Sequence, residues 1–216
     1  MKEFLPPTRK RDIMKLCGDM SQFAGVRRSL IYDGRARGVE AVSFDTGGGL
    51  TFTVLPGRGM DICEAKYRGV PLCFHAKAGL ASAETYEPQG MNWLRGFFAG
   101  LLTTCGMQNV GDPCEDADPQ LGKINHGLHG RISHTAADNV GSSAAWEGDS
   151  FVLKCAGRMR EAQLHGENLT LTRTVTAQLG EKKLIIEDEA ENCGFTPRPL
   201  MLLYHINPGH PILSPH

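Results

Sequence analysis

The sequence lacks several features that mark common classes of protein. Its formal net charge is only -1, so it has no excess of positive charge to attract nucleic acid or an anionic membrane, and we expect neither as a partner. Residues 1–12 contain no apolar core of a signal peptide, and no later run is long enough to span a membrane. We therefore expect a cytoplasmic protein.

The cysteines lack a recognisable pattern. There are seven, an odd number spread along the chain, and no two form a Cys-x-x-Cys pair. A disulfide framework of a small secreted domain would be even in number and denser. The sequence therefore predicts reduced thiols that are mostly buried.

Two catalytic signatures are also missing. The sequence contains no Gly-x-Ser-x-Gly motif, and no cysteine lies near a histidine in a pattern typical of a nucleophile. The three glycines 47–49 do not open a helix, so a phosphate-binding loop is not supported either. General acid–base chemistry remains as the simplest catalytic interpretation.

What the sequence does contain is a series of short alternating segments. The 26 glycines and 12 prolines suit a chain of many strands and turns. Residues 169–176 alternate most clearly between apolar and polar side chains. We expect strands at 26–32, 39–44, 50–55, 60–67, 70–74, 144–155, 159–164, 169–179, 182–191 and 200–206. The pattern predicts an all-β, antiparallel sandwich or barrel, and residues 1–216 read as a single domain.

The region 78–122 does not follow this pattern. Glycines 96, 100 and 106 argue against a continuous helix through 93–106, although the first half of that run could form one. The acidic stretch 112–119 is predicted to be a loop. Long irregular connections inside compact β domains are often functional.

Polar side chains concentrate in the segment Asn-His-Gly-Leu-His-Gly-Arg-Ile-Ser at 125–133. Together with His134 it places three histidines, His126, His129 and His134, within nine positions. Their spacing matches neither the usual helical nor the usual strand arrangement of metal ligands. A metal site and a surface loop that happens to be rich in histidine are both open alternatives at this point.

Four motifs, in order along the chain, resemble those of one known family. They are Pro-Gly-Arg-Gly-Met-Asp-Ile at 56–62, Leu-Leu-Thr-Thr-Cys-Gly at 101–106, Gly-Leu-His-Gly-Arg-Ile-Ser at 127–133, and Leu-Tyr-His-Ile-Asn-Pro-Gly at 203–209. The set resembles the DUF4432 group of the aldose 1-epimerase (galactose mutarotase-like) superfamily. The resemblance runs from roughly residue 15 to residue 213.

The resemblance implies a galactose mutarotase-like β-sandwich of the supersandwich type that binds a small-molecule sugar. It also implies that the two anomers of an aldose are interconverted by general acid–base catalysis, for which we expect no cofactor and no metal. By motif, His205 matches the general acid acting on the ring oxygen. His129 matches the residue that holds that oxygen, and the two rings are expected to meet across one pocket.

The remaining motif residues are assigned to substrate binding. Arg58 resembles an arginine that contacts sugar hydroxyls, and Asn207 and Asp61 are weaker candidates for the same role. Asp61 has an alternative role, which is to brace Arg58. Trp93 could stack on a sugar face, or it could belong to the core or to a lid. His126 is interpreted as incidental.

One expected residue has no counterpart. In the superfamily the catalytic base is a glutamate downstream of the second histidine motif, and no glutamate follows His205 in this sequence. We therefore expect the sandwich to be incomplete at its C-terminal end, with strands after residue 209 missing. The alternatives are a sugar-binding module without catalysis, an inert fragment of a larger epimerase, and a metal-dependent isomerase.

Overall fold

The computed structural model describes residues 7–118 and 120–214, which form a structure dominated by β-strands. A seven-stranded antiparallel sheet has the order β1-β2-β3-β4-β8-β15, with β5 also paired to β4. Its strands are β1 (Gly25–Leu30), β2 (Glu40–Asp45), β3 (Leu50–Leu55), β4 (Asp61–Tyr67), β5 (Val70–Pro71), β8 (Leu102–Met107) and β15 (Met201–Ile206).

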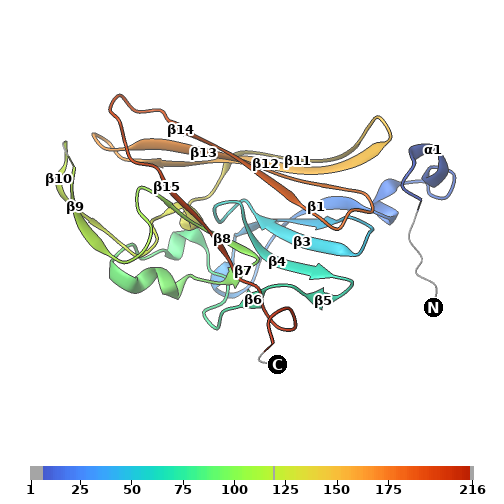
Figure 1. Cartoon of the computed structure of the whole chain (residues 1–216), viewed down its shortest axis with the longest axis horizontal. Helices are drawn as coiled ribbons and strands as arrows, with labels where there is room; N and C mark the ends of the chain where they lie inside the picture. The colour runs from blue at the N-terminus through green and yellow to red at the C-terminus, as the bar shows by residue number, and fades with distance from the viewer. Residues whose placement is uncertain (1–6, 119, 215–216) are drawn as a thin grey trace.

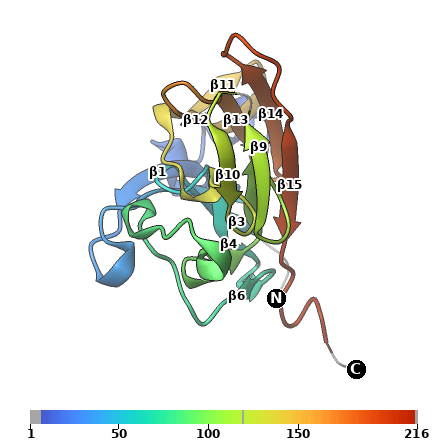
Figure 2. The same cartoon turned by 90° about the vertical axis from the view of Figure 1, so that its left-hand side faces the viewer.

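A four-stranded antiparallel sheet lies over the first (Figure 1). Its strands, in order, are β11 (Asp138–Glu147), β12 (Ser150–Ala162), β13 (Asn168–Gln178) and β14 (Ile185–Asn192). Two small pairs complete the strands: β6 (Phe74–His75) with β7 (Ala99–Gly100), and β9 (Cys114–Asp118) with β10 (Gly122–His126). The β9–β10 hairpin projects at one end of the molecule and faces the viewer in Figure 2.

The main core lies between the two sheets because each strand turns alternate side chains inward. It contains Phe44, Phe52 and Ile62 from the first sheet and Leu153 and Leu171 from the second. β3 shows the cause most directly: its apolar residues at alternate positions are buried and the threonines between them are half-buried. The predicted strands at 26–32, 39–44, 50–55, 60–67, 169–179, 182–191 and 200–206 correspond to strands of these two sheets.

Helical structure in the described residues consists of short segments of three to six residues. These are α1 (Lys10–Ile13) and the 3-10 turns η1 (Met20–Gln22), η2 (Gly34–Ala36), η3 (Ala83–Thr85), η4 (Gly90–Arg95) and η5 (Ile132–His134). No helix in the described part of the chain is long and apolar enough to cross a membrane. The segment with η3 and η4 lies on the side of the first sheet opposite the second sheet (Figure 1).

The prediction of an irregular region at 78–122 was wrong in two places. β8 is a central strand in which all six residues are buried, so no apolar–polar alternation marks it. One face of β8 meets the core between the sheets, and Cys105 on the other face packs with Trp93 and Leu128. The acidic stretch predicted to be a loop is largely β9, which pairs with β10 from Cys114–His126 to Asp118–Gly122.

The predicted turn near residue 157 was also wrong. β12 continues from Ser150 to Ala162, and the hairpin turn lies before it, between Glu147 and Ser150. Gly157 stays in the strand because it pairs with Arg173 of β13, whereas the register with β11 is irregular there, between Asp138 and Gly141. A glycine inside a strand often marks such an irregularity rather than a turn.

Candidate functional site

His205 lies on β15, where it pairs with Thr103 of β8. His129 lies in the loop after β10. Its backbone N–H donates to the Gly111 carbonyl at 3.0 Å, and its own carbonyl accepts from Gly106 at 2.9 Å. These bonds hold His129 at a φ of 58°, a conformation that a non-glycine residue adopts only when its surroundings impose it.

The neighbouring Gly130 is required for the same close approach. Its φ is 73°, and a Cβ there would run into the carbonyl oxygens of Gly106 and Asn109. The backbone of this loop therefore lies directly on the end of β8. That contact fixes the position of the His129 ring over the first sheet.

The two imidazoles meet. The ring centroids of His129 and His205 are 6.0 Å apart and the rings are nearly perpendicular, at 76°. This is within the limit of about 10 Å beyond which two rings could not serve one substrate atom. The sequence motifs therefore identified a pair of side chains that the fold brings together.

His129 has a defined tautomer in its neutral state. The Gly111 N–H donates to Nδ1 of His129 at 3.1 Å, so Nδ1 carries no proton and Nε2 carries it. Burial lowers the pKa of His129 and the nearby His205 lowers it further, while Asp112 raises it. His129 therefore offers a neutral N–H donor at physiological pH.

Aromatic rings surround the pair. Trp93 lies edge-on to His129 at 4.9 Å and stacks on Phe97 at 4.8 Å, and Phe97 in turn lies edge-on to His205 at 5.4 Å. Trp93 is buried, and its indole N–H donates to Ser133 Oγ at 3.2 Å. Of the roles left open for Trp93, the structure therefore shows it in the core beneath the histidines.

Nδ1 of His205 is buried and has no hydrogen-bond partner among residues 7–118 and 120–214. A buried polar atom without a partner costs free energy, and functional sites are one place where such a cost is retained. The structure thus leaves one buried nitrogen of His205 without a hydrogen-bond partner in the described part of the chain.

The other two histidines of the polar segment do not join this pair. His126 lies on β10 with Nε2 4.0 Å from an oxygen of Asp116. His134 is buried, stacks on Tyr86 at 4.1 Å, and has its pKa lowered to about 2 by burial and by the nearby Arg58. In the described part of the chain, no group of three His, Cys, Asp or Glu side chains is arranged to hold a metal ion.

Arg58 does not face a cleft. Its guanidinium is fully buried, and it donates from Nε to the Ser133 carbonyl at 2.7 Å, from Nη1 to the Ala81 carbonyl, and from Nη2 to the Gly96 carbonyl at 3.1 Å. Burial lowers its pKa to about 10, although the charge of Asp61 opposes this shift. The geometry does not support the predicted contact with sugar hydroxyls, because Arg58 instead ties three loop segments together.

Asp61 is also fully buried, and its hydrogen-bond partners are not those expected. Oδ1 accepts from the backbone N–H of Thr104 at 2.9 Å and from its hydroxyl at 2.6 Å, and lies 3.4 Å from Nη1 of Arg173. Oδ2 has no partner in the described residues. Burial raises the pKa of Asp61 to about 7 against the opposing charge of Arg173. Asp61 thus pairs with Arg173 rather than bracing Arg58 through a hydrogen bond.

Arg173 is the centre of a buried network that sequence reasoning missed. From β13 it forms two bonds to Asp188 of β14, at 2.8 and 2.7 Å, and one to the Thr104 hydroxyl at 2.8 Å. The Tyr204 hydroxyl, one residue from His205, donates to the same Asp188 at 2.7 Å. The network therefore joins the two sheets directly behind β15.

Asn207 acts on the backbone at the end of β15. Its side-chain amide donates to the Ala99 carbonyl at 3.1 Å and to the His205 carbonyl at 2.9 Å. Asn207 is buried. In the structure it holds the end of β15 in place, and its predicted contact with a ligand stays a prediction.

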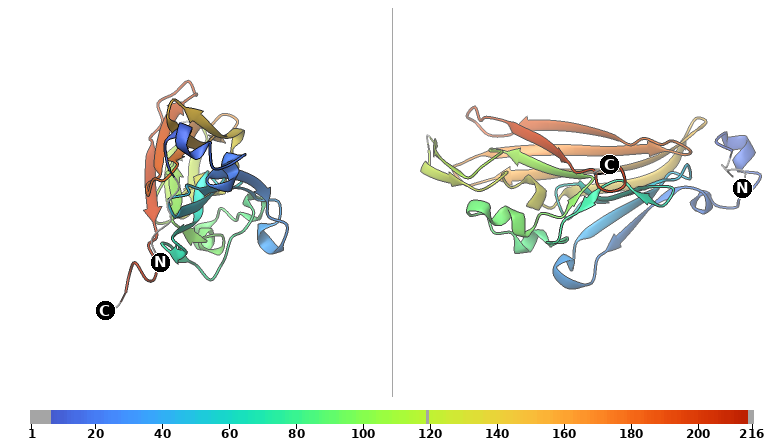
Figure 3. Two further views of the ribbon diagram at one scale, coloured as in Figure 1. Left: turned by 90° about the vertical axis from the view of Figure 1, so that its right-hand side faces the viewer. Right: turned by 60° about the horizontal axis from the view of Figure 1, so that its bottom comes forward.

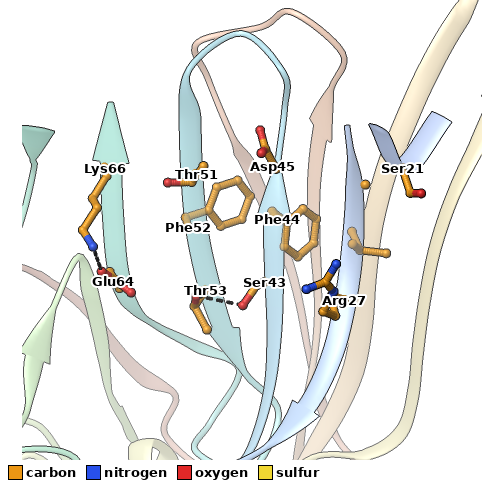
Figure 4. Close-up of a pocket in the computed structure, with 12 residues that line it drawn as sticks. Ser21, Arg27, Ser43, Phe44, Asp45, Thr51, Phe52, Thr53, Glu64 and Lys66 are labelled. Atoms are coloured by element: carbon orange, nitrogen blue, oxygen red, sulfur yellow. Dashed lines mark hydrogen bonds and ion pairs between the residues drawn. The ribbon is translucent and has the colours of Figure 1, made fainter. Parts of the chain in front are cut away.

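Two hollows bear on where a ligand could bind. One, of about 820 Å³, is lined by residues on both sides of His129 in the sequence, including His126, Gly127 and Arg131. Another, of about 450 Å³, lies on the outer face of β1 to β4, far along the sheet from β15 (Figure 4). There Glu64 pairs with Lys66 and Ser43 with Thr53.

The fold is that of a known class of protein. The structure superposes with a TM-score of 0.78 on a Klebsiella pneumoniae subsp. pneumoniae MGH 78578 protein provisionally described as an aldose 1-epimerase, at 23% identity over 88% of this chain and 48% of that one. A galactose 1-epimerase from Lactobacillus acidophilus NCFM gives a TM-score of 0.48 at 13% identity, over 78% of this chain and 49% of that one. The chain thus spans about half the length of each of these two proteins. The predicted galactose mutarotase-like sandwich is confirmed.

The sequence itself gives the family. Residues 36–216 match the family described as "Domain of unknown function (DUF4432)", and because this is most of the chain, the protein belongs to the DUF4432 family. The resemblance seen in the four motifs is confirmed. No curated protein matches the sequence.

Proposed function

We propose that the protein binds an aldose at His129 and His205 and interconverts its anomers, as an isomerase of carbohydrate metabolism. The observation that carries the proposal is the pair of imidazoles whose ring centroids lie 6.0 Å apart. Their position on a sandwich shared with a protein provisionally described as an aldose 1-epimerase supports it. The seven unpaired cysteines support a reducing, cytoplasmic compartment.

The chemistry asks for two proton transfers. A base removes the proton from the anomeric hydroxyl, an acid protonates the ring oxygen, and the C1–O5 bond breaks to give the open-chain aldehyde. Rotation about the C1–C2 bond and reclosure on the other face return both protons. In the proposal Nε2–H of His129 holds the ring oxygen and His205, in its protonated form, donates to it.

A second candidate is sugar binding without catalysis. No carboxylate within residues 7–118 and 120–214 has an assigned hydrogen bond to either imidazole, so the base that takes the anomeric proton is not assigned. A site with two imidazoles and no base would still donate hydrogen bonds to a sugar. The presence or absence of rate acceleration separates the two candidates.

Polarimetry of freshly dissolved α-D-glucose and α-D-galactose tests the proposal. We expect the wild type to accelerate mutarotation and His205→Gln to reduce the acceleration by roughly 10²- to 10⁴-fold, the usual contribution of a general acid. His165→Gln is a matched control because His165 lies in an exposed turn between β12 and β13. Sugar binding by calorimetry without acceleration favours the binding module, and the absence of both contradicts the proposal.

A further inference from the structure

Two glutamates occupy core positions at one end of the sandwich. The inward-facing positions of β12 that include Met159 continue to Glu161, and those of β13 that include Leu169 continue back to Glu167. Both glutamates are buried, with exposed fractions of 5% and 6%. In Figures 1 and 3 the turn between β12 and β13 lies at the same end of the molecule as β9 and β10. Carboxylates therefore stand here at positions where the strand period places apolar side chains elsewhere in the sheet.

The two carboxyl groups share one face of this hairpin. Glu161 pairs with Leu169, and the Gln163 N–H donates to the Glu167 carbonyl at 2.9 Å, so that Gln163 stands opposite Glu167. Glu161 and Glu167 are thus diagonal neighbours, about 7–8 Å apart at the backbone, and long side chains can meet over that separation. Burial raises the pKa of Glu161 and the charge of Glu167 raises it further, as expected for two carboxylates this close.

Neither carboxylate forms an ion pair within the described part of the chain. Oε2 of Glu161 accepts from the backbone N–H of Met107 at 3.1 Å, and Oε1 accepts from the side-chain amide of Gln108 at 3.3 Å. The carboxylate of Glu167 has no hydrogen-bond partner among residues 7–118 and 120–214. A buried carboxylate without a counter-charge is costly, and an ion bound beside it is one way to remove that cost.

Both carboxylates line a small polar cavity of about 60 Å³. Asp118 also lines it but is ion-paired with Arg198, which leaves Glu161 and Glu167 facing one further charge, that of Arg131. Arg131 is exposed and forms no ion pair with either glutamate in the described residues. The charges around the cavity therefore sum to a negative value, which favours a cation inside it.

We propose that this cavity binds a hard divalent cation, Mg²⁺ or Ca²⁺, between the carboxylates of Glu161 and Glu167. Both ions take oxygen ligands, which carboxylates, side-chain amides and water can supply together. Gln163 and Asn109 line the cavity as well and carry amide oxygens. Two carboxylates suffice for such a site, whereas a zinc site takes three or four protein ligands, and no group of three His, Cys, Asp or Glu of that kind occurs in the described residues.

The size of the cavity also selects an ion over an organic ligand. About 60 Å³ holds a cation with a few waters, whereas pockets for organic ligands measure roughly 300–1,000 Å³. A sugar or an organic amine is therefore too large for this position.

A cation here would tie the β12–β13 hairpin to the end of β8. Met107, which donates to Glu161, directly follows Gly106, whose N–H donates to the His129 carbonyl at 2.9 Å. The ion would thus stabilise the strand end on which the His129 loop rests. The inference goes beyond the proposed sugar site and does not depend on it.

Thermal unfolding of the full chain, treated with EDTA and then dialysed, tests the proposal. We expect about 10 mM Mg²⁺ or Ca²⁺ to raise Tm by about 3–6 °C over NaCl of equal ionic strength, for a Kd on the order of 1 mM. Glu167→Gln keeps the shape of the side chain and removes its charge, so this rise should disappear. Without divalent cations the variant should be at least as stable as the wild type, because its repulsion of Glu161 is gone. A response to one ion alone identifies which of the two the cavity binds.

Glu191→Gln is the matched control, because Glu191 is an exposed carboxylate of the same sheet, and it should keep the full rise. Tb³⁺, which shares the oxygen preference of Ca²⁺, reports the location, because Tyr86 lines the cavity and can transfer excitation to the ion. We expect sensitised emission that excess Ca²⁺ or Mg²⁺ displaces and that Glu167→Gln abolishes. Glu161→Gln replaces Glu167→Gln if that variant does not fold. A Tm that neither ion raises, a rise that Glu167→Gln retains, or Tb³⁺ emission that Glu167→Gln leaves unchanged would each overturn the proposal.

Discussion

Two fully buried arginines hold different parts of this molecule, and they do so by different means. Arg58 lies under the loops on the outer face of the first sheet, and its guanidinium donates hydrogen bonds to three carbonyl oxygens. Arg173 lies between the sheets and is bonded to the carboxylate of Asp188 and lies 3.4 Å from that of Asp61. Burial lowers the pKa of Arg58 to about 10, whereas at Arg173 burial is outweighed by the two carboxylates and the pKa is raised.

The difference shows what each region depends on. Carbonyl dipoles orient a guanidinium without compensating its charge, so Arg58 fixes loop geometry at an electrostatic cost. The Arg173 network balances charges, so each member depends on the others remaining. The histidine site rests on both: Arg58 bonds to Ser133, which supports Trp93 and hence His129, while Tyr204 of the network adjoins His205.

The largest expected effect is therefore loss of the charge-balanced centre. Arg173→Met leaves Asp188 buried beside Asp61 without its cation, and we expect the free energy of unfolding to fall by about 3–5 kcal/mol, measured by urea denaturation. Arg158→Met is the matched control, because Arg158 makes the same two-bond contact with Asp138 at the surface. It should change stability little.

The same measurement on Arg58→Met gives the other half of the comparison. It leaves three carbonyl groups without donors but no unpaired charge, so we expect a smaller loss of about 2–3 kcal/mol.

Adding Asp188→Leu to Arg173→Met should recover part of the lost stability, because the uncompensated carboxylate is then gone. If Arg173→Met costs no more than Arg158→Met, the network does not carry the role described.

Much of this fold follows from alternation, and the exceptions have physical causes. β3 and β13 were predicted because one face of each meets the core and the other is more polar. β8 was not predicted, because loops cover its second face and none of its six residues is exposed to mark the period. The β9–β10 hairpin was missed because residues 114–117 of β9 are all exposed, so no alternation of buried and exposed positions marks the strand.

The candidate site likewise contains residues that the sequence predicted and residues that it did not. His129 and His205 were predicted from motifs, and the fold brings them together. Arg173 was missed, although it occupies an inward position in the alternation that buries Leu171 and Val175. A cation at a core position of a strand indicates a buried ion pair. Its partners Asp61 and Asp188 could not be named from the sequence, because they come from strands 112 and 15 residues away.

A smaller effect is the dependence of stability on pH that the buried Asp61 contributes. The pKa of Asp61 is raised from 3.8 to about 7 in the fold, so between these values the native state binds more protons than the unfolded state. The contribution of Asp61 to stability is then fully present below pH 3.8 and is lost as the pH rises through 7. Unfolding measured at pH 5 and pH 8 should show a loss on the order of 2 kcal/mol in the wild type that Asp61→Asn removes. An unchanged difference in Asp61→Asn would contradict this assignment.

The smallest expected effect concerns the histidine pair itself. His129 titrates below 6.5 because of burial and the nearby His205, while Asp112 acts in the opposite direction. Following the imidazole C–H resonances by NMR, we expect His205→Gln to raise the pKa of His129 and Asp112→Asn to lower it, whereas His165→Gln should leave it unchanged. The two opposite shifts follow directly from the charges facing His129. A pKa of His129 that is indifferent to His205→Gln would contradict the assigned electrostatic coupling between the two rings.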